Sequence, residues 1–167
     1  MQQSGEVTAF CQRVQPRLLG ALTLHCGDAA VAEELTQETL AVVWDKWSRV
    51  AVMAAPEAWA LRVGFNMANS WLRRRIAERR ALRRLEPGGD HHDEPDDSGV
   101  RDAVLRLPPR QRTAVVLRYF TDLSVEQTAQ AMRCAPGTVK ALTHQGITSL
   151  RRDLALSDVE ERAPHGH

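Results

Sequence analysis

Apolar residues recur along most of this chain at the three- and four-residue spacing of an amphipathic helix, without an internal repeat or a sustained β pattern. In the first half of the chain this spacing predicts helices over about residues 6–26, 28–47 and 56–85. The last of these begins at a proline, which suits a first helical turn. The mostly apolar residues 48–55 are predicted to form a loop with some strand character.

Prolines and polar residues divide the C-terminal third of the chain into short helices. A pair of prolines ends one helix and begins another that runs to about Tyr119. Ser124 and Gln127 have the spacing of a capping box, which predicts a helix over 124–132; after a short turn a proline opens a last helix over about 136–154. A short helix, a tight turn and a longer helix are typical of a helix-turn-helix.

Residues 86–99 separate the two sets of predicted helices. This stretch has almost no apolar side chain, so it cannot bury enough surface to offset the entropy of ordering, and we interpret it as a disordered acidic linker. The sequence thus predicts an all-α protein of two small helical domains, residues 1–85 and 100–154, with a tail over 155–167. An aromatic content of 5% is low for a β-sandwich and comfortable for a helical protein.

The chain carries a net charge of only +1, but its charges are strongly segregated. Residues 71–84 contain seven arginines and one glutamate, net +6, whereas residues 85–102 contain seven acidic residues and one arginine, net −6. Arginine supplies 20 of the 22 basic side chains, and its planar guanidinium suits phosphate recognition. A local basic band attracts polyanions even when the whole chain is nearly neutral, so nucleic acid is a candidate partner.

A polar stripe follows one side of the predicted helix over 56–85. Arg62, Asn66, Asn69 and Arg73 are spaced i, i+4, i+7 and i+11, which places them on one face. Asn can contact base edges as donor and acceptor, and Arg can hold phosphates, so the stripe suits DNA. The alternative interpretation is a solvated helix face. The arginines that follow the stripe argue against it, because like charges repel one another unless a polyanion neutralises them.

The last predicted helix separates into an apolar and a polar side. Val139, Leu142, Gly146 and Leu150 are spaced to be buried. The opposite side and its flanks carry small and polar residues that could enter a DNA groove and read bases: Gly137, Lys140, Ala141, Thr143, His144, Gln145, Thr148 and Arg151. A generic three-helix bundle would show the same apolar pattern; the short turn and the basic outer face favour DNA binding.

No catalytic set of residues is recognisable in the sequence. His91, His92, Asp93 and Asp96 could bind a metal ion, but they lie in the predicted linker without spaced partners, and we interpret them as solvated. Three cysteines without a C-x-x-C pair make a disulfide framework or zinc ribbon improbable and favour a reducing compartment. With no membrane-length apolar run and no secretory signal, we expect a cytoplasmic protein without cofactor, metal or small-molecule substrate.

Four stretches, taken in order, resemble the extracytoplasmic-function (ECF) sigma factors of bacterial RNA polymerase, in particular their actinobacterial small-sigma branch. Residues 32–40 (AEELTQETL), followed by two tryptophans, resemble the family's polymerase-binding helix. Residues 56–75 resemble the helix that reads and opens the minus-ten element, and residues 107–119 and 137–140 resemble the domain that reads the minus-thirty-five element. The resemblance covers about residues 6–153.

The resemblance implies a two-domain, non-enzymatic initiation factor that binds core RNA polymerase and promoter DNA. The residues it implies for polymerase binding are Glu34, Leu35, Gln37, Glu38 and Asp45. Those it implies for the minus-ten element are Arg62, Asn66, Asn69, Arg73 and Arg74. Those it implies for the helix-turn-helix are Gly137, Thr138, Lys140, Ala141, His144, Gln145 and Thr148. Two positions depart from the family: Arg133 stands where the turn often has Gly, and Ala135 where Ser or Thr usually caps the recognition helix.

Three other functions stay open on the sequence. A stand-alone helix-turn-helix repressor would leave the acidic face of residues 34–45 and the arginine-rich helix without a role. A polymerase-binding interaction protein without promoter activity would not use its DNA-facing helices. A metal-dependent enzyme would rest only on the His-Asp cluster of the linker. The sequence also leaves open whether an anti-sigma factor binds and which promoters are read.

Overall fold

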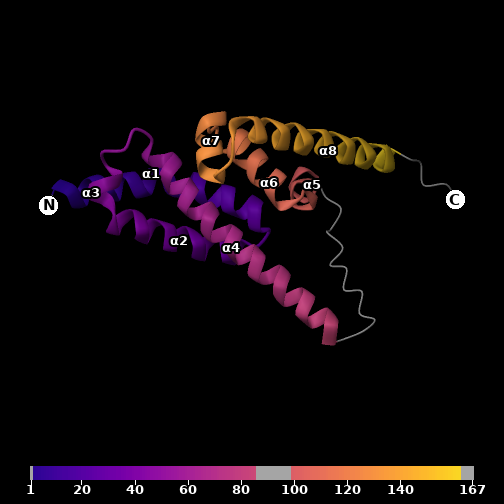
Figure 1. Ribbon diagram of the computed structural model, residues 1–167, viewed down its shortest axis with the longest axis horizontal. Helices are drawn as coiled ribbons and strands as arrows, with labels where there is room; N and C mark the ends of the chain where they lie inside the picture. Colours follow the sequence, from indigo (N-terminus) through magenta and orange to yellow (C-terminus); the bar gives the residue numbers. More distant parts are fainter. Residues whose placement is uncertain (1, 86–98, 163–167) are drawn as a thin grey trace.

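A computed structural model describes residues 2–85 and 99–162, and within these ranges every regular element is helical (Figure 1). In chain order the elements are α1 (Gln2–Cys26), α2 (Ala29–Asp45), α3 (Trp47–Val50), α4 (Pro56–Leu85), α5 (Val100–Arg106), α6 (Pro109–Val115), η1 (Val116–Phe120), α7 (Val125–Met132) and α8 (Pro136–Arg162). The prediction of an all-α fold is confirmed. Apart from Gly99, the predicted linker lies outside the described residues.

Helices α1, α2 and α4 pack together as an N-terminal bundle (Figure 1). Asp28 begins α2, because its carboxylate accepts a hydrogen bond from the backbone N–H of Val31 at 3.1 Å. Gly64 lets α4 approach both neighbours: a Cβ there would lie 2.8 Å from Leu18 Cδ1 and 3.2 Å from Thr39 Oγ1. These contacts determine which faces of α2 and α4 remain at the surface.

The predicted strand character of residues 48–55 is wrong. After α2 the chain forms a single helical turn, α3, in which the N–H groups of Arg49 and Val50 donate to the Lys46 carbonyl at 2.9 and 3.0 Å. Residues 51–54 form turns and bends, and Val50 is fully buried. The apolar character of the segment therefore reflects the burial of a helical turn and not pairing in a sheet.

Helices α5 to α8, with η1, form the C-terminal domain. The predicted capping box is present: the Gln127 N–H donates to Ser124 Oγ and the Ser124 N–H donates to Gln127 Oε1, both at 3.0 Å. Arg133 ends α7 with a φ of +53°, and α8 then runs to Arg162, beyond the predicted end. Gly146 lets α8 approach α6, because a Cβ there would lie 2.6 Å from a methyl carbon of α6.

The segment between α6 and α7 departs from the continuous helix predicted to Tyr119. Its last residues form a π-helix, η1, which ends with the Thr121 N–H donating to the Val116 carbonyl at 3.1 Å. Asp122, with a φ of +56°, then turns the chain toward α7. The wider turn of η1 directs Phe120 against α1.

The two domains are in contact. Helix α5 and η1 pack on α1, and α7 packs on α4 (Figure 1). The C-terminal halves of α4 and α8 extend away from this shared region, and residues 73–85 of α4 are all exposed (Figure 1). In the two described ranges, no helix combines the length and the apolar character needed to cross a membrane.

Candidate polymerase and nucleic-acid interfaces

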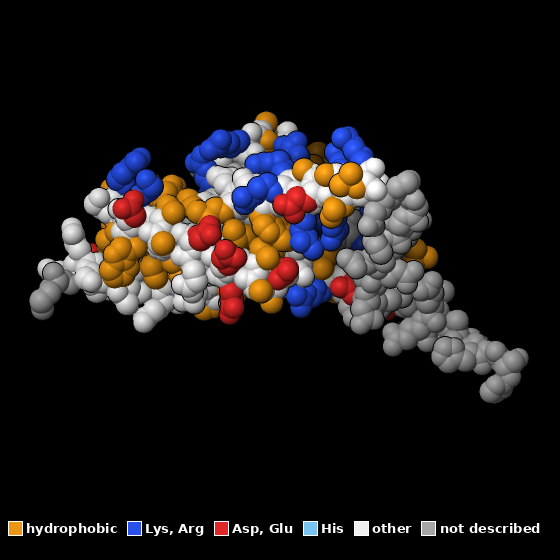
Figure 2. All heavy atoms as spheres, turned by 90° about the horizontal axis from the view of Figure 1, so that it is seen from below, with side chains coloured by type: hydrophobic (Ala, Val, Ile, Leu, Met, Phe, Trp, Pro, Cys, Tyr) orange, Lys and Arg blue, Asp and Glu red, His pale blue; other side chains and the backbone are white. Residues whose placement is uncertain are grey.

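The face of α2 implied for polymerase binding lies at the surface. Trp44, which is 52% exposed, lies among polar side chains that are also exposed: Glu34, Gln37, Glu38 and Asp45. Leu35 instead belongs to the core, with 6% exposure, so its side chain cannot touch a partner in this conformation. Figure 2 views the molecule from below relative to Figure 1. Acidic and hydrophobic side chains are intermixed over the middle of the face that it shows.

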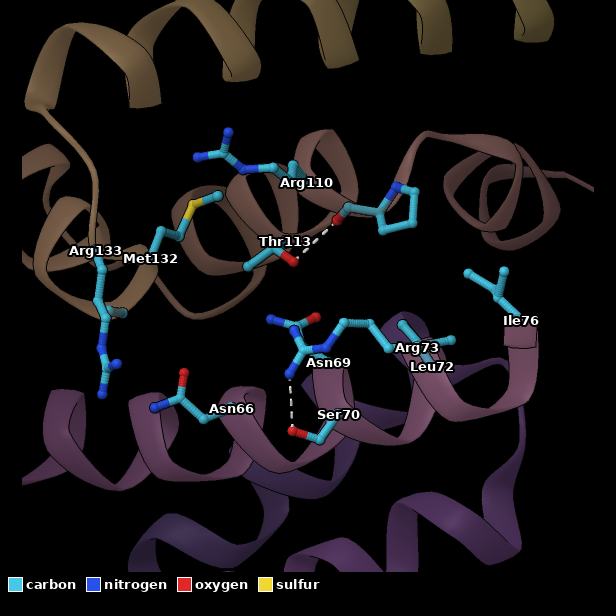
Figure 3. A pocket seen from close by; sticks show the side chains of 12 residues that line it. Asn66, Asn69, Ser70, Leu72, Arg73, Ile76, Arg110, Thr113, Met132 and Arg133 are labelled. Atoms are coloured by element: carbon cyan, nitrogen blue, oxygen red, sulfur yellow. Dashed lines mark hydrogen bonds between the residues drawn. The ribbon is translucent and has the colours of Figure 1, made fainter. Parts of the chain in front are cut away.

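The polar stripe of α4 lies partly at the surface and partly under the C-terminal domain. Its residues divide into two groups: Asn66, Arg73 and Arg74 are exposed, and Arg62 and Asn69 are half-buried. The Asn69 Oδ1 atom lies 2.8 Å from Nε2 of the buried His25, which leaves its NH₂ group for other partners. Arg73 donates from Nη2 to Ser70 Oγ at 3.0 Å (Figure 3).

A pocket of about 630 Å³ lies between this stripe and the C-terminal domain (Figure 3). On the α4 side it is lined by Asn66, Asn69 and Arg73. On the other side it is lined by residues that the sequence did not indicate as DNA contacts: Arg110, Thr113, Met132 and Arg133. Three arginines and no acidic side chain are among its described lining residues, so the pocket is positively charged. No local pattern could have identified the second group, because its role arises only where the two domains meet.

The outer face of α8 is open to solvent over most of its length. Thr138 is half-buried, and the other residues implied for the helix-turn-helix are exposed: Gly137, Lys140, Ala141, His144, Gln145 and Thr148. A groove of about 310 Å³ runs along Lys140 and His144 and is bounded by Arg118 and Tyr119 of η1. Sequence reasoning missed these two, because the π-helix that carries them has no simple sequence signal. Tyr119 is 62% exposed, and the Arg118 guanidinium donates to the Leu123 carbonyl.

His25, near the end of α1, contacts both α4 and the C-terminal domain. Burial lowers its pKa from 6.5 to about 4; the hydrogen bond to Asn69 opposes this shift and the positive charge of Arg112 adds to it. The Arg112 Nη1 atom donates to the His25 carbonyl oxygen at 2.7 Å. Burial also raises the pKa of the neighbouring Cys26 thiol to about 11. At neutral pH the His25 ring is therefore uncharged and the Cys26 thiol is protonated.

Metal-ligating residues do not gather in the part of the chain that the structure describes. Among these residues, no three or more His, Cys, Asp or Glu side chains are close enough together to hold an ion. The His-Asp cluster at residues 91–96 lies outside the described ranges. Cys11, Cys26 and Cys134 are half-buried free thiols.

Known protein families match the parts of the chain that carry the candidate interfaces. The model for sigma-70 region 2 matches residues 10–86, and that for sigma-70, region 4 matches residues 99–150. The RNA polymerase sigma-E factor of Streptomyces antibioticus is 32% identical over 167 residues, covering 95% of this chain and 92% of that protein. The ECF RNA polymerase sigma factor SigL of Mycobacterium tuberculosis is 30% identical over 143 residues, or 77% of each chain.

The sigma factor RpoE from Bartonella quintana, solved in complex with the anti-sigma factor NepR, superposes with a TM-score of 0.76. The match covers 90% of this chain and 97% of that chain at 22% identity, so it shows the fold alone. The region 2 match contains α2 and α4, and the region 4 match contains the helix-turn-helix. A stand-alone repressor is not favoured, because it would have no use for region 2. The chain belongs to the sigma-70 family and is an ECF sigma factor, a transcription initiation factor that directs RNA polymerase to promoters.

Proposed function

We propose that α2 carries the contact with core RNA polymerase. An exposed tryptophan is the kind of side chain that dominates protein interfaces, and Trp44 is surrounded by polar groups that can determine orientation and partner choice. The contacting residues are Glu34, Gln37, Glu38 and Asp45. Leu35, buried beneath them, holds the helix in place instead of touching polymerase.

The stripe on α4 receives the non-template strand of the minus-ten element. Asn66 can offer both its oxygen and its nitrogen to base edges, whereas Asn69 offers only its NH₂ group while its oxygen is bonded to His25. Arg62, Arg73 and Arg74 contact phosphates, and the exposed arginine-rich half of α4 extends that contact. Extruding a base costs a few kcal/mol, so these contacts supply part of the free energy of strand opening.

Helix α8 reads the minus-thirty-five element in the major groove. Lys140, His144 and Thr148 face the bases, while the small Gly137 and Ala141 let the start of the helix approach the DNA closely. Arg118 and Tyr119, at the edge of the same groove, contact the flanking backbone. Thr138 and Gln145 lie at the sides of this surface and complete it.

These assignments rest mainly on the polar stripe of α4, which continues into an exposed, arginine-rich half-helix. The same chain also has a helix-turn-helix with a basic outer face. The chain supplies no catalytic step, since RNA synthesis is the chemistry of polymerase, and it works in the cytoplasm, where polymerase acts. An anti-sigma protein, as NepR is for the Bartonella quintana factor, is a further candidate partner.

Run-off transcription from genomic fragments with core RNA polymerase, with and without the protein, tests the proposal. We expect defined new transcript starts only when the protein is present. Lys140→Ala with His144→Ala should weaken binding of the upstream element by the complex about tenfold or more, since a good base contact contributes about 1–3 kcal/mol. Lys46→Ala, which changes the chain's other lysine, in the N-terminal domain, should leave this binding unchanged. Duplex binding without polymerase and without new starts would support a repressor instead.

A further inference from the structure

The pocket between the α4 stripe and the C-terminal domain has the dimensions of a small-molecule site. Its volume of about 630 Å³ lies within the range of about 300–1,000 Å³ that such sites occupy. Helix α4 forms one wall, and residues at the start of α6 and at the end of α7 form the others (Figure 3). Because α7 packs directly on α4, the space suits one compact ligand. We call it the interdomain pocket.

The charged side chains that line the interdomain pocket are all positive. Arg73 comes from α4, Arg110 from α6, and Arg133 directly follows α7. No carboxylate among the described residues forms an ion pair with any of the three; Glu57 and Asp153 pair with other arginines. Like charges around one space repel one another, and an anion placed among them removes that repulsion. The pocket therefore favours a ligand that carries several negative charges.

Neutral hydrogen-bond donors add to the positive charge of the pocket. The Asn69 oxygen is bonded to the His25 ring, so its NH₂ group remains to donate. Ser70 Oγ accepts from Arg73 Nη2 at 3.0 Å, which leaves the hydroxyl hydrogen free to donate. Guanidinium, amide and hydroxyl donors bind most strongly to charged acceptors such as phosphate oxygens. A lining rich in donors and without a described carboxylate thus fits phosphate groups.

An apolar surface lies beside these donors. Leu72 and Met132 are half-buried lining residues, and Ile76, which also lines the pocket, is 39% exposed. In Figure 3, Leu72 and Ile76 lie along α4 on one side of Arg73, and Asn66 lies on the other. A ring system can pack on such side chains while its charged groups meet the arginines. Inorganic phosphate would leave this surface unused, so the lining as a whole favours a nucleotide.

We propose that the interdomain pocket binds a nucleoside polyphosphate. The phosphates lie among Arg73, Arg110 and Arg133, and the base packs on the apolar side chains that α4 contributes. The site also includes Asn66, so an occupied pocket competes with single-stranded DNA for part of the α4 stripe. This competition rests on the proposed function, whereas the binding site rests on the lining of the pocket alone.

Isothermal titration calorimetry of the full chain with ATP, GTP and inorganic triphosphate tests the site. An ionic strength of about 0.15 M screens the non-specific attraction of the arginine-rich half of α4. We expect one nucleotide per chain, bound about tenfold more tightly than inorganic triphosphate because the base buries apolar surface. No binding of ATP or GTP at about 1 mM would overturn the proposal. Equal affinity for inorganic triphosphate would overturn the assignment of the apolar surface to a base.

Two matched pairs of substitutions separate the pocket from general charge. Arg110→Gln with Arg133→Gln removes two guanidinium groups from the pocket and should weaken nucleotide binding about tenfold or more, since charge-assisted hydrogen bonds are lost. Arg101→Gln with Arg152→Gln removes the same charge from exposed positions of the same domain outside the pocket, and should leave the affinity unchanged. Equal losses for both pairs, with native helicity by circular dichroism, would show attraction by net charge and overturn the site.

The apolar surface has a matched pair of its own on α4. Ile76→Ala should weaken ATP or GTP binding about threefold or more and leave inorganic triphosphate binding unchanged, because only the base loses a contact. Leu82→Ala removes an apolar side chain that is 65% exposed and lies outside the pocket, so it should change neither affinity. An unchanged nucleotide affinity for Ile76→Ala would contradict base packing there.

Competition with DNA gives a separate readout. A short labelled single-stranded DNA of mixed sequence, bound to the full chain and followed by fluorescence anisotropy, should be displaced by the nucleotide that binds in the titration. Displacement that is lost in the Arg110→Gln, Arg133→Gln variant would support a shared surface. Nucleotide binding without displacement would support the pocket and count against the assignment of the α4 stripe to DNA, so the two proposals fail separately.

Discussion

Acidification should destabilise this fold through one buried histidine. The His25 ring lies 4.9 Å from the ring of Phe65, centroid to centroid, and its Nε2 is 2.8 Å from Asn69 Oδ1. Within the described residues, the buried Nδ1 atom has no hydrogen-bond partner. A second proton on the ring would therefore be buried without an acceptor, and it would also be repelled by the positive charge of Arg112.

The size and sign of the effect follow from the pKa of His25, which burial lowers from 6.5 to about 4. Because the unfolded chain binds this proton more readily, the contribution to stability is complete above pH 6.5 and is lost as the pH falls toward 4. The full shift corresponds to about 3 kcal/mol, of which about 2 kcal/mol is lost between pH 7 and pH 5. For a chain of this length such a loss lowers Tm by about 4–8 °C.

Urea unfolding followed by circular dichroism, at several pH values between 7 and 5, measures this loss. His25→Gln keeps an N–H donor for Asn69 but cannot titrate, so the variant should lack about 2 kcal/mol of the wild-type pH dependence over this range. His144→Gln, at an exposed position, is the matched control and should retain the wild-type slope. Identical slopes for wild type and His25→Gln would refute the reasoning.

Other predictions concern the interfaces and the turn before α8. Glu34→Lys with Gln37→Lys should weaken core polymerase binding in a pull-down while helicity by circular dichroism stays native. Asn66→Ala should reduce promoter opening about tenfold, seen as weaker permanganate reactivity of the melted thymines, because a base contact worth about 1–3 kcal/mol is lost; upstream duplex binding should not change. Arg133→Gly should raise the free energy of unfolding by about 0.5–1 kcal/mol, since it relieves a φ of +53° on a residue with a side chain. Ala135→Ser should add about 1 kcal/mol by capping the first N–H groups of α8, and urea unfolding that shows no gain would contradict the cap.

The packing of the two domains affects how the α4 stripe should be studied. The carboxamide oxygen of Asn69 is bonded to the ring of His25, and the carbonyl oxygen of His25 accepts a hydrogen bond from Arg112 of the C-terminal domain. Variants of Asn69 therefore alter interdomain packing as well as DNA contact, whereas Asn66 is exposed and changes the DNA surface more cleanly. The two asparagines of the stripe are not equivalent probes.

The sequence by itself determined the local elements, because their causes lie within a few residues of one another. The capping box of Ser124 and Gln127, the start of α4 at a proline and the face shared by Asn66 and Arg73 all follow from helix periodicity and short-range hydrogen bonds. Where the local signal was ambiguous, prediction failed: the apolar residues 48–55 bury a helical turn and form no strand.

The tertiary structure alone decided how the domains meet. The contacts that join them, from Arg112 to His25 and from Phe120 to Gly20, connect residues far apart in the sequence, and the first pair is separated by 87 positions. Periodicity shows that a helix has an apolar face, but it does not show which other face will cover it. That choice depends on close complementarity, here a glycine notch that admits an aromatic ring and a helix end that accepts a buried guanidinium.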